Sequence, residues 1–182
     1  ARVSIPDAQV LDDLVNDFTI SCWVQIDALD ASKKTIILWK GVSSGNGAAK
    51  KSPFSIKVFN SGHANNAGKV LVALGEVSAN GNQTLNSATA LTLGSPQMIT
   101  MTADGTTLSL YINGVLSASA PQTIAPGVNN NPLILGGLDG NTYSVDGFVD
   151  ELAILNRTLA SSEILNIYNA SSDGMWKELP AV

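Results

Sequence analysis

The stretch Phe18-Thr19-Ile20-Ser21-Cys22-Trp23-Val24-Gln25-Ile26 places an apolar side chain at every second position. A period of two is typical of a β-strand with one face in a core. The residues from Phe18 to Ile26 with even numbers are predicted to face that core, and the intervening residues, which include Trp23, are predicted to face outward. This segment therefore indicates a half-buried strand and favours a β fold.

The same alternation recurs along the chain, in residues 54–59, 70–74, 99–103, 108–112 and 149–155. Asp104-Gly105 and Asn113-Gly114 predict tight hairpins, because these residues tolerate the positive φ that such turns need. Many short strands separated by turn signals indicate an antiparallel sandwich or barrel. One helix is predicted over Leu159–Asn169, with Glu163 at the acidic position of a capping box whose first residue is Ala160.

Length and composition exclude several classes of protein. A chain of 182 residues is predicted to form one domain. A formal net charge of −5 argues against a nucleic-acid partner, which requires a basic face. The apolar runs are too short for a membrane-spanning helix, so membrane insertion is not expected. The single cysteine, Cys22, excludes an intrachain disulfide and is predicted to be a buried, inert thiol.

Three motifs occur in a recognisable order: Phe18-Thr19-Ile20 with Trp23, the hairpins of residues 102–114, and residues 146–151 followed by 157–164. Together they resemble the laminin-G-like (concanavalin A-like lectin/glucanase) jelly-roll domain over residues 3–168. The resemblance implies an all-β antiparallel β-sandwich jelly roll with one short C-terminal helix. We expect the domain to span residues 1–170, with a C-terminal tail over residues 171–182. This superfold hosts many functions, so the motifs name no ligand.

The first strand, around Val3, is expected at an open sheet edge, because almost nothing precedes a segment before which family domains tend to carry another strand. An unpaired edge can accept a strand from another protein subunit.

Catalysis is not expected. Retaining glycoside hydrolysis needs two carboxyl groups about 5 Å apart. Asp150 and Glu151 are adjacent, and neighbours on a strand point to opposite faces. The other glutamates, residues 76, 163 and 178, have no suitable partner in sequence.

Two regions are candidate carbohydrate sites. Trp23 and Tyr111 are predicted to project from one outer sheet face beside hydroxyl side chains, a combination typical of sugar sites; the alternative is burial beneath a covering segment. Trp39 is assigned to the core, on the same face as Ile37. The second region is an amide-rich loop with the candidate residues Asn60, His63, Asn65 and Asn66, for which the alternative is a solvated connector.

Asp146 and Asp150 are the candidate metal ligands, because the resemblance implies a structural calcium, at Asp150 in particular. The alternative is that Asp150 or Glu151 pairs with Arg157. Two functions remain open. One is a non-catalytic carbohydrate-binding or adhesion module that binds a glycan or polysaccharide outside the cell, on a cell surface or a virion. The other is a structural, decoration or assembly subunit of a phage or cell-surface particle.

Overall fold

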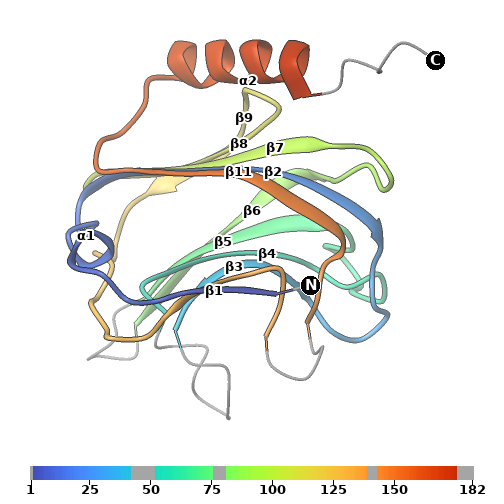
Figure 1. Cartoon of the computed structure of the whole chain (residues 1–182), viewed down its shortest axis with the longest axis horizontal. Coiled ribbons are helices and arrows are strands. Elements are labelled where there is room, and N and C mark those ends of the chain that lie inside the picture. Colours follow the sequence, from blue (N-terminus) through green and yellow to red (C-terminus); the bar gives the residue numbers. More distant parts are fainter. Residues whose placement is uncertain (1, 42–51, 76–80, 139–142, 176–182) are drawn as a thin grey trace.

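Two antiparallel β-sheets pack face to face in the computed structural model, which describes residues 2–41, 52–75, 81–138 and 143–175 (Figure 1). Strands follow the order β1-β10-β3-β4-β5-β6 in the six-stranded sheet and β11-β2-β7-β8-β9 in the five-stranded sheet. The expected all-β sandwich is confirmed. The elements are β1 (Val3–Ile5), α1 (Gln9–Asp12), β2 (Asp17–Ala28), β3 (Thr35–Lys40), β4 (Phe54–Val58), β5 (Lys69–Gly75), β6 (Asn82–Ala90), β7 (Gln97–Asp104), β8 (Thr107–Ile112), β9 (Val115–Pro121), β10 (Leu133–Leu135), β11 (Asp146–Leu155) and α2 (Ser161–Met175).

The core between the sheets follows from the alternation in β2. Its even-numbered residues from Phe18 to Ile26 belong to the buried cluster between the sheets, as the sequence predicts. Cys22 is among them, and burial raises the pKa of its thiol to about 12. A thiol that stays protonated is a poor nucleophile, so Cys22 acts as a small apolar side chain.

Both predicted hairpins form. Gly105 has φ 78° between β7 and β8, and Asn113 and Gly114 have φ 52° and 77° between β8 and β9. Asp104 Oδ1 accepts hydrogen bonds from the backbone N–H groups of Thr106 and Thr107 at 2.8 and 2.6 Å. These turns hold β7, β8 and β9 in register over the core.

The two long sides of the sandwich differ. On the β6 side, Gln83 Nε2 donates to the carbonyl of Pro121 (2.8 Å), and Ala88 N donates to Ser117 Oγ (3.0 Å), which ties the two sheets together. On the opposite side, β1 pairs only with β10 and forms the edge of its sheet, as predicted.

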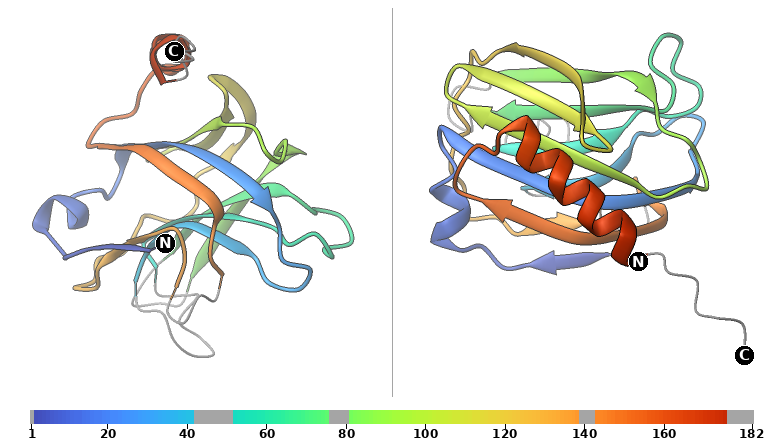
Figure 2. Two further views of the ribbon diagram at one scale, coloured as in Figure 1. Left: turned by 45° about the vertical axis from the view of Figure 1, so that its right-hand side comes forward. Right: turned by 90° about the horizontal axis from the view of Figure 1, so that it is seen from above.

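Helix α2 lies across the outer face of the five-stranded sheet (Figures 1 and 2). It starts two residues later and ends six residues later than the predicted Leu159–Asn169. The first five residues assigned to a tail, 171–175, are therefore helical, and residues 176–182 lie outside the described part of the chain. Among the described residues, none of the helices could cross a membrane by its length and apolar character.

The start of α2 corrects one prediction. Ala160 N donates to Glu163 Oε2 at 2.9 Å. This is one of the two hydrogen bonds of a capping box, and it does not require a hydroxyl side chain at residue 160. Arg157 binds both carboxylate oxygens of Glu163 at 2.9 and 3.1 Å and thereby lowers the pKa of Glu163. The alternative in which Arg157 pairs with Asp150 or Glu151 is therefore wrong, because Glu163, the third residue of α2, binds its guanidinium.

Candidate functional site

Trp23 and Tyr111 do not form an exposed platform. Only 4% of Trp23 and 9% of Tyr111 is exposed, because α2 covers both rings. Tyr168 of α2 stacks on Trp23 with ring centroids 5.6 Å apart and an interplanar angle of 20°. Both rings project from the outer face of the five-stranded sheet, as predicted. Because two aromatic rings present a large apolar surface, packing α2 against them stabilises the fold. The alternative of burial applies here, and the prediction of a sugar platform is corrected.

The hydroxyl side chains of that face bond within the chain. Thr19 Oγ1 donates to the carbonyl of Arg157 (2.9 Å) and accepts from Leu159 N (3.0 Å). Ser21 Oγ and Thr100 Oγ1 are 2.8 Å apart. The Thr19 bonds anchor the segment that leads into α2, and the Ser21–Thr100 bond joins β2 to β7 beneath it.

A cavity of about 280 Å³ remains between α2 and strands β2 and β11. Its lining is mostly apolar, with Ser21, Trp23 and Glu151 as the polar members. The Trp23 Nε1 atom is buried and has no acceptor in the described residues. Glu151 has φ 47° beside a register shift in β11, a left-handed conformation that is uncommon for a non-glycine residue.

The outer face of the six-stranded sheet is different in kind. Its buried side chains form two small clusters outside the main core: Ile36, Trp39, Ile134 and Leu138, and Phe59, Leu71 and Ala73. Trp39 is buried, with 3% of its surface exposed, as the core assignment predicts, but the prediction that it shares a face with Ile37 is wrong. A register shift between Ile36 and Leu38 turns the strand, so that Ile37 and Leu38 lie in the core and Trp39 lies on the outer face.

Two lysine ammonium groups lie over aromatic rings on this face. Lys57 Nζ is 4.4 Å from the centre of the Trp39 ring, and Lys34 Nζ is 4.6 Å from the centre of the Phe59 ring. Burial, and to a lesser degree the charge of Lys34, lowers the pKa of Lys57 to about 8. Neither ammonium forms a salt bridge within the described residues.

Two further polar atoms on this face lack a partner within the described chain: Trp39 Nε1 and Asn86 Oδ1. The register pairs Lys57 with Leu71 and Leu71 with Asn86. Because neighbouring strands are about 4.8 Å apart, Asn86 and Lys57 belong to one row roughly 10 Å long. Side chains in such a row share one sheet face, so this face gathers a cation without a salt bridge, a donor and an acceptor, the latter two without a hydrogen-bond partner in the described residues.

The amide loop adjoins this face. Its four candidate residues lie together between β4 and β5, and the His63 ring contacts the Phe59 ring at 4.5 Å. Asn60 Nδ2 donates to the carbonyl of Ala31 (2.7 Å), and His63 Nδ1 accepts from the backbone N–H groups of Asn65 and Asn66. Asn60 and His63 therefore hold the loop in shape, while the Asn65 side chain is exposed. The loop is on the other sheet from Trp23 and Tyr111, so the six candidates do not form one site.

The metal candidates do not fit one ion. Asp146 and Asp150 are four positions apart on β11, which separates their Cα atoms by about 13 Å. Oxygen ligands of one calcium lie about 2.4 Å from it, and so within about 5 Å of each other. Asp150 Oδ1 also accepts from Glu151 N at 2.8 Å. In the described ranges, no three His, Cys, Asp or Glu side chains form a group that could hold a metal.

An apolar groove of about 190 Å³ runs along the open side of the sandwich, between β1, β10 and β11. Val3 and Leu135 line it from one sheet, and Phe148 and Val149 line it from the other. Val3 is 54% exposed. The predicted open edge therefore coincides with a hollow that apolar side chains line.

The residues that sequence reasoning missed are Lys34, Trp39, Lys57, Phe59 and Asn86. The alternation of residues 54–59 does place Lys57 opposite the core. What the pattern could not supply is the pairing of β4 with β3 and the shift in β3, which together bring Trp39 under the Lys57 ammonium.

Solved structures share this fold at low sequence identity. The binding domain of botulinum neurotoxin serotype G superposes with a TM-score of 0.70 at 13% identity, over 94% of this chain and 40% of that one. The CBM40 of the Ruminococcus gnavus IT-sialidase, bound to α2,3 sialyllactose, gives 0.69 at 15% identity, over 92% and 98%. The binding domain of botulinum neurotoxin DC, in complex with rat synaptotagmin II, gives 0.66 at 15% identity, over 93% and 40%. The chain thus spans about 40% of the neurotoxin domains.

No curated protein sequence matches the chain significantly. The family model does: Laminin_G_3 matches residues 1–165, and the chain belongs to this family of the concanavalin A-like lectin/glucanase superfamily.

Proposed function

We propose that the protein is a non-catalytic carbohydrate-binding module whose binding surface is the outer face of the six-stranded sheet beside the amide loop. The observation that carries this proposal is a set of polar groups there: the ammonium groups of Lys34 and Lys57, which form no salt bridge within the described residues, and the buried atoms Trp39 Nε1 and Asn86 Oδ1, which have no hydrogen-bond partner among them. Buried polar groups in proteins nearly always have a hydrogen-bond partner. Sugars supply both acceptors and donors, and their apolar C–H faces suit aromatic surroundings such as Phe59 and His63.

The comparisons support the proposal at the level of the fold. The CBM40 module described above carries a bound sialyllactose on a similar sandwich. Absence of catalysis is part of the proposal. Of the described glutamates, Glu151 lines the cavity on the α2 side, and Glu163 is paired with Arg157. Neither offers a carboxylate to the six-stranded face, where hydrolysis would need two of them.

Display outside the cell, on a cell surface or a virion, is the setting in which such a module meets polysaccharides, and it belongs to the proposal. Limited proteolysis of intact cells or particles tests it, because only a displayed domain is cut before lysis.

A second candidate function is assembly with other protein subunits, and the open side of the sandwich favours it. Within the described chain, β1 forms the edge of its sheet and pairs with a strand on one side only, and the groove beside it is apolar. A strand from another chain could add to such an edge. Sedimentation analysis tests this function, since an assembly subunit forms a defined oligomer and an isolated module stays monomeric.

A matched pair of variants on a glycan array tests the proposed surface. Asn86→Leu removes the unpartnered acceptor from the six-stranded face, and Trp23→Phe removes the unpartnered indole donor from the α2 cavity. We expect Asn86→Leu to weaken glycan binding about tenfold, as for one lost hydrogen bond in a desolvated site. Trp23→Phe should leave binding unchanged. Equal glycan binding by the two variants would show that the binding site is not on the six-stranded face. An array on which no glycan binds would refute the proposed carbohydrate-binding function.

A further inference from the structure

Within the described residues, the two lysines of the proposed binding surface have no salt bridge with an acid. The ammonium groups of Lys34 and Lys57 each lie over an aromatic ring, and the two charges repel each other. The protein has 15 acidic and 10 basic residues, so carboxylates are not scarce. Two lysines that lie close together without a carboxylate beside them, within the described chain, are therefore a feature of this surface and not of the overall composition.

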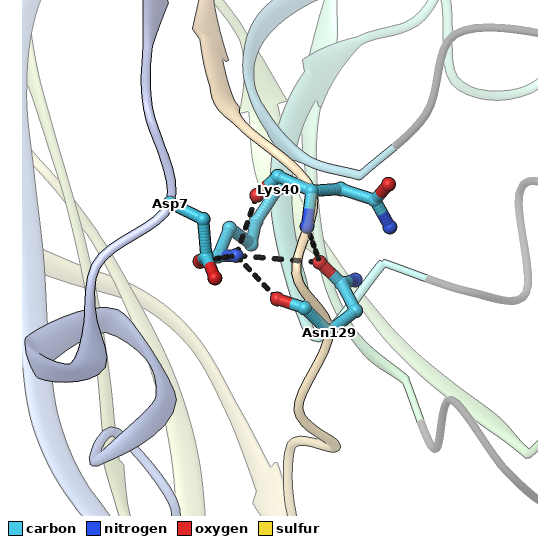
Figure 3. A network of polar contacts seen from close by, with 4 residues as sticks. Asp7, Lys40 and Asn129 are labelled. Atoms are coloured by element: carbon cyan, nitrogen blue, oxygen red, sulfur yellow. Dashed lines mark hydrogen bonds and ion pairs between the residues drawn. The ribbon is translucent and has the colours of Figure 1, made fainter.

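Lys40 shows how the same protein satisfies a buried ammonium. Its Nζ forms a salt bridge with Asp7 and donates to the carbonyl of Asn131 (2.6 Å), the carbonyl of Asn129 (2.8 Å) and Asn129 Oδ1 (3.3 Å), as Figure 3 shows. Lys57 has none of these partners. Asp30, the acid nearest to Lys34 in sequence, is occupied by the backbone N–H groups of Ser32 and Lys33 at 2.7 and 2.8 Å.

The surface is rich in hydrogen-bond donors. Trp39 Nε1 is a donor that lacks an acceptor, and both ammonium groups only donate. Because His63 Nδ1 accepts from two backbone N–H groups, the ring proton is assigned to Nε2, which is then a further donor. Asn86 Oδ1 is the opposing acceptor. A ligand that complements this set has more acceptors than donors, as carboxylates and sulfate esters have.

We infer that the glycan bound on this surface is acidic, and that its carboxylate or sulfate group binds between the ammonium groups of Lys34 and Lys57. This inference rests on the proposed function. Both side chains keep part of their surface exposed, so an anion can approach them from solvent. The lowered pKa of Lys57 agrees with this assignment, because an ammonium held without a counter-ion loses its proton more readily.

Titration calorimetry on the full chain tests the inference with four ligands. They are sialyllactose, its neutral counterpart lactose, a sulfated disaccharide and its unsulfated form. We expect each acidic ligand to bind at least about tenfold more tightly than its neutral counterpart, as for one charge-assisted hydrogen bond. The carboxylate and sulfate arms identify which group is preferred.

Three variants separate a local contact from general charge. Lys57→Met and Lys34→Met keep the apolar stems and should each reduce the acidic preference to less than threefold. Lys33→Met is the matched control, because Lys33 lies in the same turn, is exposed and carries the same charge. It should keep the preference. Equal loss in all three variants would reduce the effect to long-range charge and overturn the inference.

Failure of the inference and failure of the proposed function are distinguishable. Equal binding of acidic and neutral glycans, lost in Asn86→Leu, would overturn the acidic specificity and leave the module intact. Binding of no glycan would overturn both. Thermal melting of each variant shows whether it is folded; if Lys57→Met is not, Lys34→Met decides, because its side chain is more peripheral to the sheet.

Discussion

The two outer faces of this sandwich each carry one buried tryptophan whose indole N–H has no acceptor in the described chain, but the neighbours of the two rings differ. Trp23, on the five-stranded sheet, stacks on Tyr168 beneath α2, and the hydroxyls beside it bond within the chain. Trp39, on the six-stranded sheet, lies under the Lys57 ammonium, next to polar atoms that have no partner in the described chain. An outward-facing aromatic residue therefore says little about function until the state of its polar neighbours is known.

The largest expected loss of stability comes from a substitution that weakens the packing of α2 on the five-stranded sheet. Ile164 is fully buried between α2 and the sheet, so Ile164→Ala should destabilise the protein by about 3 kcal/mol, as large-to-small substitutions in a core do. Denaturant unfolding measures this loss. Leu165→Ala is the control, because Leu165 is 41% exposed and should cost less than about 1 kcal/mol. Similar losses for both would show that α2 is not a packed cover.

The next effect concerns the uncompensated charge of the other face. The pKa of Lys57 falls from 10.5 in a free lysine to about 8 in the folded chain. Between these values the unfolded chain binds the proton and the folded chain does not, so raising the pH favours folding. Below pH 8 the charged side chain therefore costs about 3 kcal/mol, which Lys57→Met should recover.

The measurement is the difference in stability between wild type and Lys57→Met from pH 7 to 10.5. Wild type should approach the variant as the pH rises. Comparison with the variant is needed because Cys22, whose pKa is raised to about 12, acts in the opposite direction at alkaline pH. A difference that stays constant with pH would contradict a depressed pKa of Lys57.

A smaller effect is expected from the hydroxyl that docks the α2 segment. Thr19→Val removes one hydrogen bond to the carbonyl of Arg157 and one from Leu159 N. The loss should be about 1–2 kcal/mol, since the isosteric side chain leaves a buried donor and acceptor unsatisfied. Urea unfolding measures it, with Thr106→Val, in an exposed turn, as the control. An unchanged free energy of unfolding in Thr19→Val would mean that water replaces the hydroxyl as the hydrogen-bond partner.

The smallest effect concerns calcium, which the family resemblance implies at Asp150. Asp146 and Asp150 are too far apart on β11 to share one ion. We therefore expect EDTA to leave the melting temperature unchanged at matched ionic strength. A drop that added calcium reverses, through binding to the folded state alone, would show that a metal is held by other ligands together with one of these carboxylates.

The fold could be predicted from sequence where local rules suffice. The period of two in residues 18–26 assigns the core side of β2, and Asp104-Gly105 and Asn113-Gly114 define two hairpins. The site could not be predicted in the same way. Ile37 and Trp39 are separated by an even number of positions, yet the register shift at Ile36 puts them on different faces. Likewise, no local pattern reveals that α2 returns to cover Trp23 and Tyr111.

The oxygen atoms around the Lys40 ammonium bear on how the stability of this domain depends on divalent cations. A carboxylate, two backbone carbonyls and an amide oxygen surround its ammonium, and these are the hard oxygen donors that divalent cations select. The chain thus supplies its own counter-ion where the segments around residues 7, 40 and 130 converge. Because the Lys40 ammonium already occupies the position between these oxygens, we expect the stability of this junction not to depend on the calcium or magnesium concentration.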